Sequence, residues 1–323
     1  MKAIRFAKTG GPEVLTLQDI ELPPPAPGQA RVNHGAIGVN FLDTYHRSGL
    51  YPVALPSGLG TEAVGTVEAV GEGVTSVKPG DRVGYCTGPL GAYAEASNVP
   101  ADRVVKLPAA IGDEVAAAAM LKGMTAQYLL KQTFKVQAGQ TILFHSAAGG
   151  VGLIAGQWAK HLGATVIGTV GSDGKIELAK ARGYDHVLNL KMDDWVAKVR
   201  ELTNGEGVPV VYDSVGKDTF AGSLDCLAVR GMLVSFGNSS GAVPAFEPGI
   251  LSAKGSLYLT RPTLFHYARA AHELQAMADD LFAVIASGAV KIVINQRFAL
   301  KDARAAHEAL HSRKTTGATV LVP

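Results

Sequence analysis

From Gln140 onward, short runs of β-branched and apolar residues alternate with segments of helical composition. Strands that alternate with helices in this way run parallel, because each helix returns the chain to the same end of the sheet. The pattern predicts an α/β fold with a doubly wound parallel sheet. We expect strands at Thr141–His145, Ala164–Thr169, His186–Asn189, Val208–Asp213, Gly231–Phe236 and Ser256–Thr260. We expect the intervening helices at Val151–Leu162, Lys175–Arg182, Asp193–Leu202 and Thr219–Ala228.

The first third of the chain predicts a second, β-rich unit. Short β-type runs occupy Lys2–Phe6 and Ala30–Asn40, and the linker between them carries four prolines, which fix φ and cannot donate a hydrogen bond. Between Gly58 and Gly91, valines alternate with glycine turns, a pattern typical of a barrel-like antiparallel domain. Further helices are expected at Asp113–Lys122, Thr125–Lys131 and Tyr267–Ser287, followed by a strand and a helix that ends near Ser312.

Composition excludes several classes of protein. The 323 residues carry 30 basic and 28 acidic side chains, scattered along the chain, whereas nucleic-acid binding requires a clustered basic face. Two cysteines, Cys86 and Cys226, are too few for a disulfide framework or a four-thiolate zinc site, and they favour the cytoplasm. We find no signal-peptide pattern and no apolar run long enough to span a membrane.

The segment that carries chemistry is the glycine-rich turn Ser146–Gly152, between the first expected strand of the alternating region and the helix that follows it. Small residues let a backbone approach a pyrophosphate, and a helix N-terminus offers free N–H groups and a positive dipole end. Relative to G-x-G-x-x-G, alanine stands at the first glycine position, but the strand–turn–helix context is the one that a dinucleotide fingerprint requires. The segment predicts a dinucleotide site.

The second strand indicates which nicotinamide cofactor binds there. NAD sites usually place an acidic residue at the tip of this strand, where it binds the ribose 2′-hydroxyl. Here the tip reads Thr169-Val170-Gly171-Ser172, and Lys175 follows. An ammonium attracts a 2′-phosphate that a carboxylate would repel. Asp173 lies beyond the strand and is expected to cap the next helix, so the sequence favours NADPH.

These motifs resemble the quinone oxidoreductase/ζ-crystallin group of the medium-chain dehydrogenase/reductase superfamily. The resemblance begins with the segment from Gly139 to Lys160 that contains the glycine-rich turn, and it covers essentially the whole chain. Further matching segments are Asn40–Tyr45, Arg47–Pro52, Gly58–Glu62, Gly80–Val83, Val211–Gly216 and Ser235–Gly241. The resemblance implies a GroES-like catalytic domain formed by residues 1–123 and 263–323. It also implies a Rossmann NADPH-binding domain over residues 124–262, and a homodimer.

The resemblance also implies the site residues. It places a quinone in an interdomain cleft beside the nicotinamide, among the expected catalytic residues Asn40, Asp43, Tyr45, Tyr51 and Arg261. The expected cofactor-binding residues are Thr125, Ala148, Gly149, Gly150, Val151, Gly152, Gly171, Lys175, Phe236, Asn238 and Arg313. The group often has a tyrosine where this chain has Leu190, a departure that bears on the preference for NADPH.

Zinc-dependent members of the superfamily bind their catalytic metal at positions that correspond here to Asn40 and Thr61-Glu62. An amide and a hydroxyl are poor replacements for thiolate and imidazole, so no metal is expected. A quinone suits such a site, because its conjugated carbonyls need less Lewis-acid polarisation than an alcohol or aldehyde does. We therefore expect NADPH-dependent quinone reduction, by hydride transfer or by single electrons.

Two other functions remain open at this point. An enone or 2-alkenal reductase would require similar geometry for hydride delivery, and a crystallin-like protein would bind NADPH without turnover. A third reading, a serine hydrolase with its nucleophile elbow at Gly237–Gly241, fails. The elbow needs a helix directly after the serine, and Pro244 and Pro248 follow instead.

Overall fold

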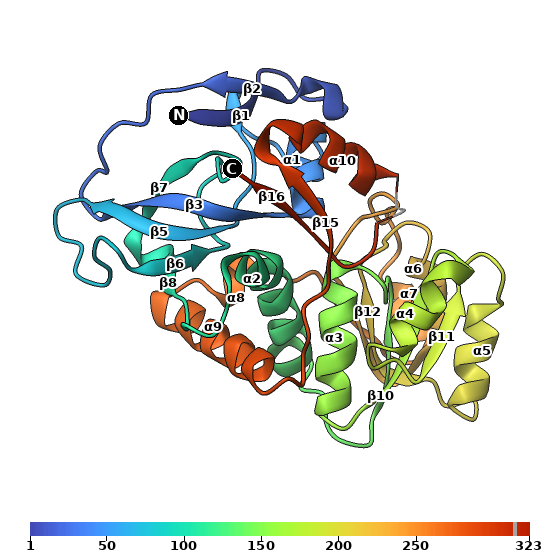
Figure 1. The fold of residues 1–323 in the computed structure, drawn as a ribbon. Helices are drawn as coiled ribbons and strands as arrows, with labels where there is room; N and C mark the ends of the chain where they lie inside the picture. The colour runs from blue at the N-terminus through green and yellow to red at the C-terminus, as the bar shows by residue number, and fades with distance from the viewer. Residues whose placement is uncertain (313–314) are drawn as a thin grey trace. The chain divides into compact units, whose positions relative to one another are not determined.

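The computed structural model describes residues 1–312 and 315–323 and divides into two compact units (Figure 1). The first comprises Met1–Met124, Tyr267–Ala286 and Ile292–Pro323, and the second comprises Thr125–His266 and Ser287–Lys291. The first unit is therefore built from both ends of the chain. None of the helices in the described ranges is both long enough and apolar enough to cross a membrane.

The second unit contains a parallel sheet in the order β11-β10-β9-β12-β13-β14. This order reverses direction beside β9, the arrangement of the doubly wound dinucleotide-binding fold, so the predicted fold is confirmed. The strands are β9 (Thr141–Phe144), β10 (Thr165–Val170), β11 (His186–Asn189), β12 (Val208–Asp213), β13 (Leu227–Ser235) and β14 (Tyr258–Thr260). The helices are α3 (Gly150–His161), α4 (Ile176–Lys180), α5 (Trp195–Leu202), α6 (Phe220–Asp225) and α7 (Gly249–Ala253).

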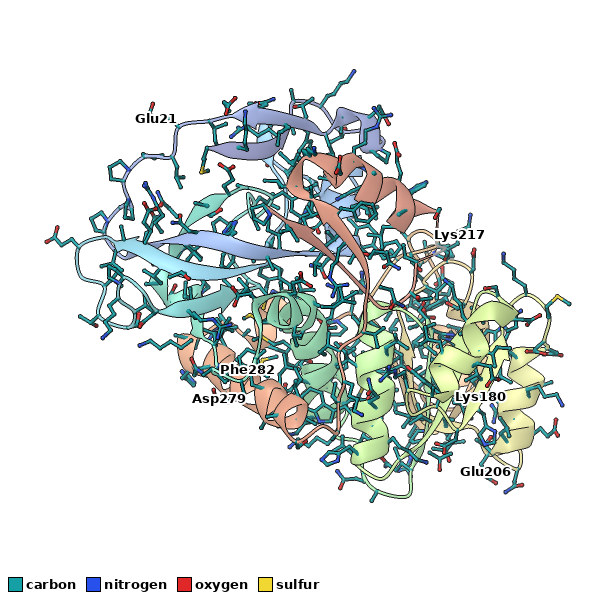
Figure 2. The ribbon with its side chains drawn as sticks, in the orientation of Figure 1. Glu21, Lys180, Glu206, Lys217, Asp279 and Phe282 are labelled. Carbon is teal, nitrogen blue, oxygen red and sulfur yellow. The ribbon has the colours of Figure 1, made fainter. Side chains whose placement is uncertain are left out.

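Apolar residues of the strands form the core of this unit. Leu143, Ile167, Val211 and Leu233 come from four neighbouring strands and belong to one buried cluster. Strands buried on both faces carry near-continuous apolar runs, which explains why the sequence pattern located them well. Charged side chains such as Lys180 and Glu206 lie on the outside of the unit (Figure 2).

The first unit contains a larger, mainly antiparallel sheet in the order β15-β16-β3-β5-β6-β8, in which β7 also pairs with β3, and a small sheet β2-β1-β4. The larger sheet includes β3 (Gln29–Val39), β5 (Ala63–Val70), β6 (Arg82–Tyr85), β7 (Ala96–Pro100), β8 (Val105–Lys106), β15 (Ile294–Ala299) and β16 (Ala318–Val322). The small sheet includes β1 (Lys2–Phe6), β2 (Thr16–Asp19) and β4 (Ser57–Gly58). The helices are α1 (Phe41–Ser48), α2 (Asp113–Tyr128, which continues into the second unit), α9 (Ala271–Ala286) and α10 (Ala303–His311).

Three helical segments differ from the sequence prediction. The expected helices over 113–122 and 125–131 form one helix, α2, followed by a π-helical turn over Leu129–Thr133. Gly123 lies within α2 and permits close packing of this helix on α9, because a Cβ there would come within 2.4 Å of the Leu281 side chain. The expected helix Tyr267–Ser287 is present as α9, which begins later than expected, at Ala271, after the separate short helix α8 (Leu264–Tyr267). Helix α1 was not predicted at all.

Candidate active site

The glycine-rich turn joins β9 to α3, as predicted. Ser146 adopts a left-handed backbone conformation with φ of 58°, which is unusual for a residue with a side chain. Its hydroxyl accepts a hydrogen bond from Ser214 Oγ at 3.0 Å, and its carbonyl accepts one from Gly149 N at 2.9 Å. These contacts fix the turn ahead of the first residues of α3, whose backbone N–H groups have no acceptor within the helix.

Glycines in and around the turn allow close approach of backbone to backbone. A Cβ on Gly152 would lie 2.3 Å from the Ser146 carbonyl oxygen and 2.8 Å from that of Ala147. Gly152 therefore lets the helix begin directly on the turn. Gly156 of α3 and Gly168 of β10 both pack against the ring of Tyr184. A Cβ at either glycine would collide with that ring. Such a compact turn at a helix N-terminus is the arrangement that binds phosphate groups in dinucleotide-binding proteins.

The tip of β10 carries the residues that distinguish the two nicotinamide cofactors. Lys175 ends a short 3-10 turn, Asp173–Lys175, and partial burial lowers the pKa of its ammonium. Gly171 is exposed, and a Cβ there would meet no described atom within 4 Å. The predicted capping role of Asp173 was wrong: its carboxylate accepts a hydrogen bond from Asn189 Nδ2 at 2.8 Å. Asp173 is thus engaged by β11.

The end of β13 brings further predicted residues together in the second unit. Arg261 Nη1 donates to the Ser235 carbonyl at 2.7 Å. The Asn238 side-chain amide can hydrogen-bond through both its nitrogen and its oxygen in one orientation. In this orientation the nitrogen donates to Gly237 O at 2.9 Å and the oxygen accepts from Arg261 Nη2 at 3.2 Å. Phe236 packs on Phe144 with ring centroids 5.6 Å apart. The remaining predicted cofactor residues in this unit are Thr125, which is buried in α2, and Ala148, Gly150 and Val151 of the turn and α3.

In the first unit, Asn40 and Asp43 build the first turn of α1. Asn40 precedes the helix, and its backbone N–H donates to Asp43 Oδ2 at 2.8 Å while Asp43 N donates to the Asn40 carbonyl at 3.1 Å. Asp43 is fully buried, and desolvation raises the pKa of its carboxyl group to about 7, although hydrogen bonds from Asn40 and Tyr93 oppose the shift. These contacts explain why a helix begins at Phe41.

A buried chain of polar groups connects the two ends of α1 through α10. Arg47 Nη1 donates to His307 Nδ1 at 3.0 Å, because a guanidinium can only donate. His307 therefore carries its proton on Nε2 and donates to the Tyr93 hydroxyl at 3.1 Å, and that hydroxyl donates to Asp43 Oδ2 at 2.8 Å. Desolvation and the Arg47 charge lower the pKa of His307 to about 3, so the imidazole stays neutral. The chain of donors has one direction, from Arg47 to Asp43.

Tyr45 and Tyr51 form the accessible part of this region. Their ring centroids lie 5.2 Å apart, and Phe41 and His46 pack on the same pair at 6.4 Å and 6.1 Å. Both tyrosines are half-buried, and Tyr51 N donates to the Tyr45 carbonyl at 3.1 Å. Such a group of rings offers flat apolar surface with phenolic hydroxyls, which suits an aromatic or conjugated ligand.

The positions that resemble a metal site hold a different arrangement. Asn40 Nδ2 donates to Glu62 Oε2 at 2.8 Å, and Leu121 N donates to Glu62 Oε1 at 2.6 Å. Lys122 Nζ lies 3.6 Å from the same Oε2, and both charged side chains are buried. Zinc needs lone pairs, whereas Glu62 already accepts from N–H groups and faces an ammonium. These donors do not fit a zinc ion, and no group of three or more His, Cys, Asp or Glu side chains in the described ranges is placed to hold a metal.

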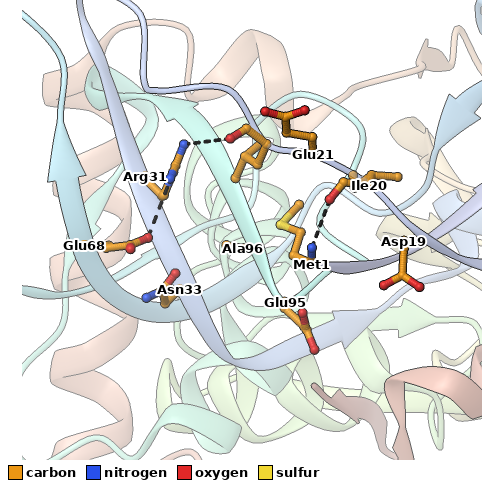
Figure 3. A pocket seen from close by; sticks show the side chains of 10 residues that line it. Met1, Asp19, Ile20, Glu21, Arg31, Asn33, Glu68, Glu95 and Ala96 are labelled. Carbon is orange, nitrogen blue, oxygen red and sulfur yellow. Dashed lines mark hydrogen bonds and ion pairs between the residues drawn. The ribbon is translucent and has the colours of Figure 1, made fainter.

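Arg313 lies outside the described residues. An open hollow of about 720 Å³ in the first unit is lined by none of the predicted residues, and Arg31, one of its lining side chains, pairs with Glu68 at 4.0 Å (Figure 3). Its lining residues are Met1, Asp19, Ile20, Glu21, Leu22, Arg31, Asn33, Glu68, Glu95 and Ala96.

Sequence reasoning missed the partners that hold these groups. Tyr93, His307 and Lys122 belong to no local motif, and each reaches the site from a distant part of the chain. A partial signal was available in Glu62, because the family resemblance assigned it, like Asn40, to a metal-binding position. A buried carboxylate requires a cation or donors, so a lysine of an apolar helix could have been sought as its partner.

Comparison with known proteins agrees with this architecture. Residues 26–109 match the alcohol dehydrogenase GroES-like domain, and residues 150–283 match the zinc-binding dehydrogenase family. The chain is 57% identical over its full length to a quinone oxidoreductase of Pseudomonas aeruginosa, of which it covers 99%. It is 46% identical to a 2-haloacrylate reductase of Burkholderia sp., with 98% of this chain and 97% of the relative covered.

A solved structure shows the same likeness in three dimensions. The crystal structure of Escherichia coli quinone oxidoreductase complexed with NADPH superimposes with a TM-score of 0.99 at 52% identity, over 100% of both chains. The fold and the sequence of this chain therefore match those of the solved quinone oxidoreductase over the entire length of both chains. The chain belongs to the quinone oxidoreductase family of the medium-chain dehydrogenase/reductase superfamily.

Proposed function

We propose that this protein is an NADPH-dependent quinone reductase that works without zinc. The observation that carries the proposal is the combination of the turn Ser146–Gly152, where Gly152 admits no side chain, with Lys175 at the tip of β10. Relatives named quinone oxidoreductase, one of them solved with NADPH, support it. When bound, NADPH supplies the reducing equivalents through its nicotinamide ring.

The residues of the chain divide by role. The turn and the N-terminus of α3 bind the pyrophosphate, and Lys175 binds the 2′-phosphate. Phe236, Asn238 and Arg261 contact the nicotinamide end of the cofactor. Asn40 and Asp43 serve as positioning residues, because their hydrogen bonds are directed into α1 and toward Glu62.

Tyr45 and Tyr51 are the residues that we propose to contact the quinone. Their rings stack against its conjugated plane, and a phenolic hydroxyl can donate to a carbonyl oxygen as negative charge develops there. Neither role requires a metal ion, because the quinone is already electron-poor.

A panel of electron acceptors tests this function. We expect NADPH oxidation with 1,4-benzoquinone and 9,10-phenanthrenequinone, and much slower oxidation with a simple enone or a 2-haloacrylate. The measurement is the fall in nicotinamide absorbance at a fixed NADPH concentration. Turnover with the enone or haloacrylate alone would assign the chain to the second candidate, an activated-alkene reductase, which the 46% identical 2-haloacrylate reductase supports. Tight NADPH binding without turnover on any acceptor would indicate a crystallin-like binding protein.

We also propose a homodimer that forms along the edge strand β14. This strand pairs with β13 on one side, and its Tyr258 side chain is 59% exposed. Val229 on β13 is 75% exposed, an unusual state for two large apolar side chains of neighbouring strands. A second copy of the chain can cover both by continuing the sheet.

Light scattering after gel filtration tests the dimer. We expect twice the chain mass of 33.6 kDa for the unaltered protein and a shift toward one chain mass for Tyr258→Arg. Leu202→Arg, on α5 beside the opposite edge of the same sheet, is the matched control and should stay dimeric. A Tyr258→Arg protein that keeps the doubled mass would place the interface elsewhere.

The cytoplasm is the compartment we propose. Cys86 and Cys226 are both buried free thiols, and burial raises the pKa of each, which keeps them inert in a reducing environment.

A further inference from the structure

A buried ion pair lies beneath the first turn of α1. Glu62 is completely buried just before β5, and Lys122 of α2 is 5% exposed, with Nζ 3.6 Å from Glu62 Oε2. Among the described residues Lys122 Nζ has no hydrogen-bond partner. Its contribution to this cluster is therefore its positive charge and not a directed hydrogen bond.

Two N–H donors and one ammonium surround the Glu62 carboxylate. Leu121 N donates to Oε1, while Asn40 Nδ2 donates to Oε2 and Lys122 lies beside it. Gly38 makes room for this arrangement, because a Cβ at that position would come within 2.0 Å of Oε2. Other ionisable groups that interact electrostatically with Glu62 are Asp43, Tyr93 and Cys86. Lys122 is the cation paired with this carboxylate.

An ionised Glu62 determines which way the Asn40 amide faces. A carboxylate can only accept, so it must receive the amide nitrogen and never the amide oxygen. Asn40 Nδ2 accordingly donates to Glu62 at 2.8 Å and approaches the Gly38 carbonyl at 3.5 Å. A protonated Glu62 would offer a hydroxyl donor in the same place, and the amide could turn over to accept it. The orientation of Asn40 thus depends on the charge state of Glu62.

We propose that Lys122 is a positioning residue for quinone reduction: by holding Glu62 as a carboxylate, it fixes the Asn40 amide and with it the start of α1. Tyr45 lies on that helix, just over one turn after Asn40. The proposal rests on the proposed function, in which Tyr45 contacts the quinone. Lys122, which belongs to no sequence motif, would thus act on α1 through two intervening side chains, Glu62 and Asn40.

The test compares Lys122→Met with the double variant Lys122→Met/Glu62→Gln. In the single variant, the buried Glu62 side chain loses its cation, which favours the neutral, protonated form of its carboxyl group over the carboxylate. We expect kcat with 9,10-phenanthrenequinone to fall about tenfold at pH 6 and to recover as the pH rises toward 9, with the Kd for NADPH unchanged. In the double variant, the side-chain amide oxygen at position 62 can still accept from Asn40, although its NH2 group then faces Leu121 N. We expect kcat to return to within a few-fold of the unaltered enzyme and to lose the added pH dependence. Lys106→Met removes an exposed lysine of the same unit as a control.

Infrared difference spectroscopy supplies a readout independent of turnover. The carbonyl band of a protonated carboxylic acid should appear in Lys122→Met at pH 6 and be absent from the double variant. A single variant with the unaltered pH profile and no such band would overturn the proposal, as would equal loss of kcat in both variants. If the single variant does not fold, the double variant tests the proposal by itself. A large loss of kcat in a folded double variant would contradict the expected recovery and overturn the proposal. Failure of the unaltered enzyme to reduce any quinone would refute the proposed function. The infrared measurement would still show whether Lys122 keeps Glu62 ionised.

Discussion

Replacing Lys175 with alanine should weaken NADPH binding about 50-fold while changing NADH binding less than about twofold. The expected loss is that of one charge-assisted hydrogen bond to the 2′-phosphate, which NADH lacks. Partial burial already lowers the pKa of this ammonium, so a bound phosphate would stabilise its charged form. The measurement is the Kd of each cofactor, by calorimetry or nicotinamide fluorescence, at a fixed ionic strength.

The control for this experiment lies on the next helix. Lys180 of α4 is exposed and pairs with Glu177 at 3.1 Å, so Lys180→Ala should leave both affinities unchanged. Lys175→Arg should retain the preference for NADPH, because it keeps the charge. Equal weakening of NADPH and NADH in Lys175→Ala would show that Lys175 supports the turn and does not read the phosphate. Leu190, where the family often has a tyrosine, would then be the next position to vary.

Asp43→Asn should become more stable relative to the unaltered protein as the pH rises, by up to about 4 kcal/mol between pH 4 and pH 8. Burial raises the pKa of Asp43 from 3.8 to about 7, so the folded protein holds a proton there that the unfolded chain has already released. The contribution of this group to stability is complete below pH 4 and is lost as the pH rises through 7. An amide cannot ionise and escapes this loss. The measurement is the free energy of unfolding in urea at several pH values.

Comparing the two proteins at each pH removes the other titrating groups from the result. His34 and His307 have lowered pKa values, about 4 and about 3, and destabilise the fold toward acid in both proteins alike. Asp279→Asn, on the exposed face of α9, should give a difference that does not vary with pH. A constant difference for Asp43→Asn as well would mean that Asp43 is ionised in the folded protein throughout this range.

The sequence was most informative where structure follows from neighbouring residues. The strand β9, the turn Ser146–Gly152 and the helix α3 lie within some twenty consecutive residues, and their small-residue pattern predicted both fold and cofactor class. The exact bounds of β11 and β12 followed from short apolar runs between turn residues. Lys175 could be predicted as a 2′-phosphate contact because the tip of the second strand is where this fold binds the ribose 2′ group.

The remainder of the candidate site depends on contacts that no local pattern contains. Tyr93 and His307 meet across 214 positions, and Arg47 and His307 across 260. Helix α1 was missed because its start depends on Asp43, a residue whose carboxylate is held by the distant Tyr93. Long-range pairs of this kind form only when the whole first unit is assembled, so the chain order of the residues gives no sign of them.

The pairing of β16 with β3 has a consequence for how the protein is made. Thr319, Val320 and Leu321 pair with Val39, Gly38 and Ile37, so the last strand of the chain completes a sheet begun by one of the first. During synthesis, the second unit has all of its strands before β16 leaves the ribosome, while this edge of β3 waits unpaired. An exposed strand edge is prone to pair with other chains. Synthesis of β16, and not the emergence of β3, is therefore the step that closes this sheet of the first unit and ends the exposure of that edge to misassembly.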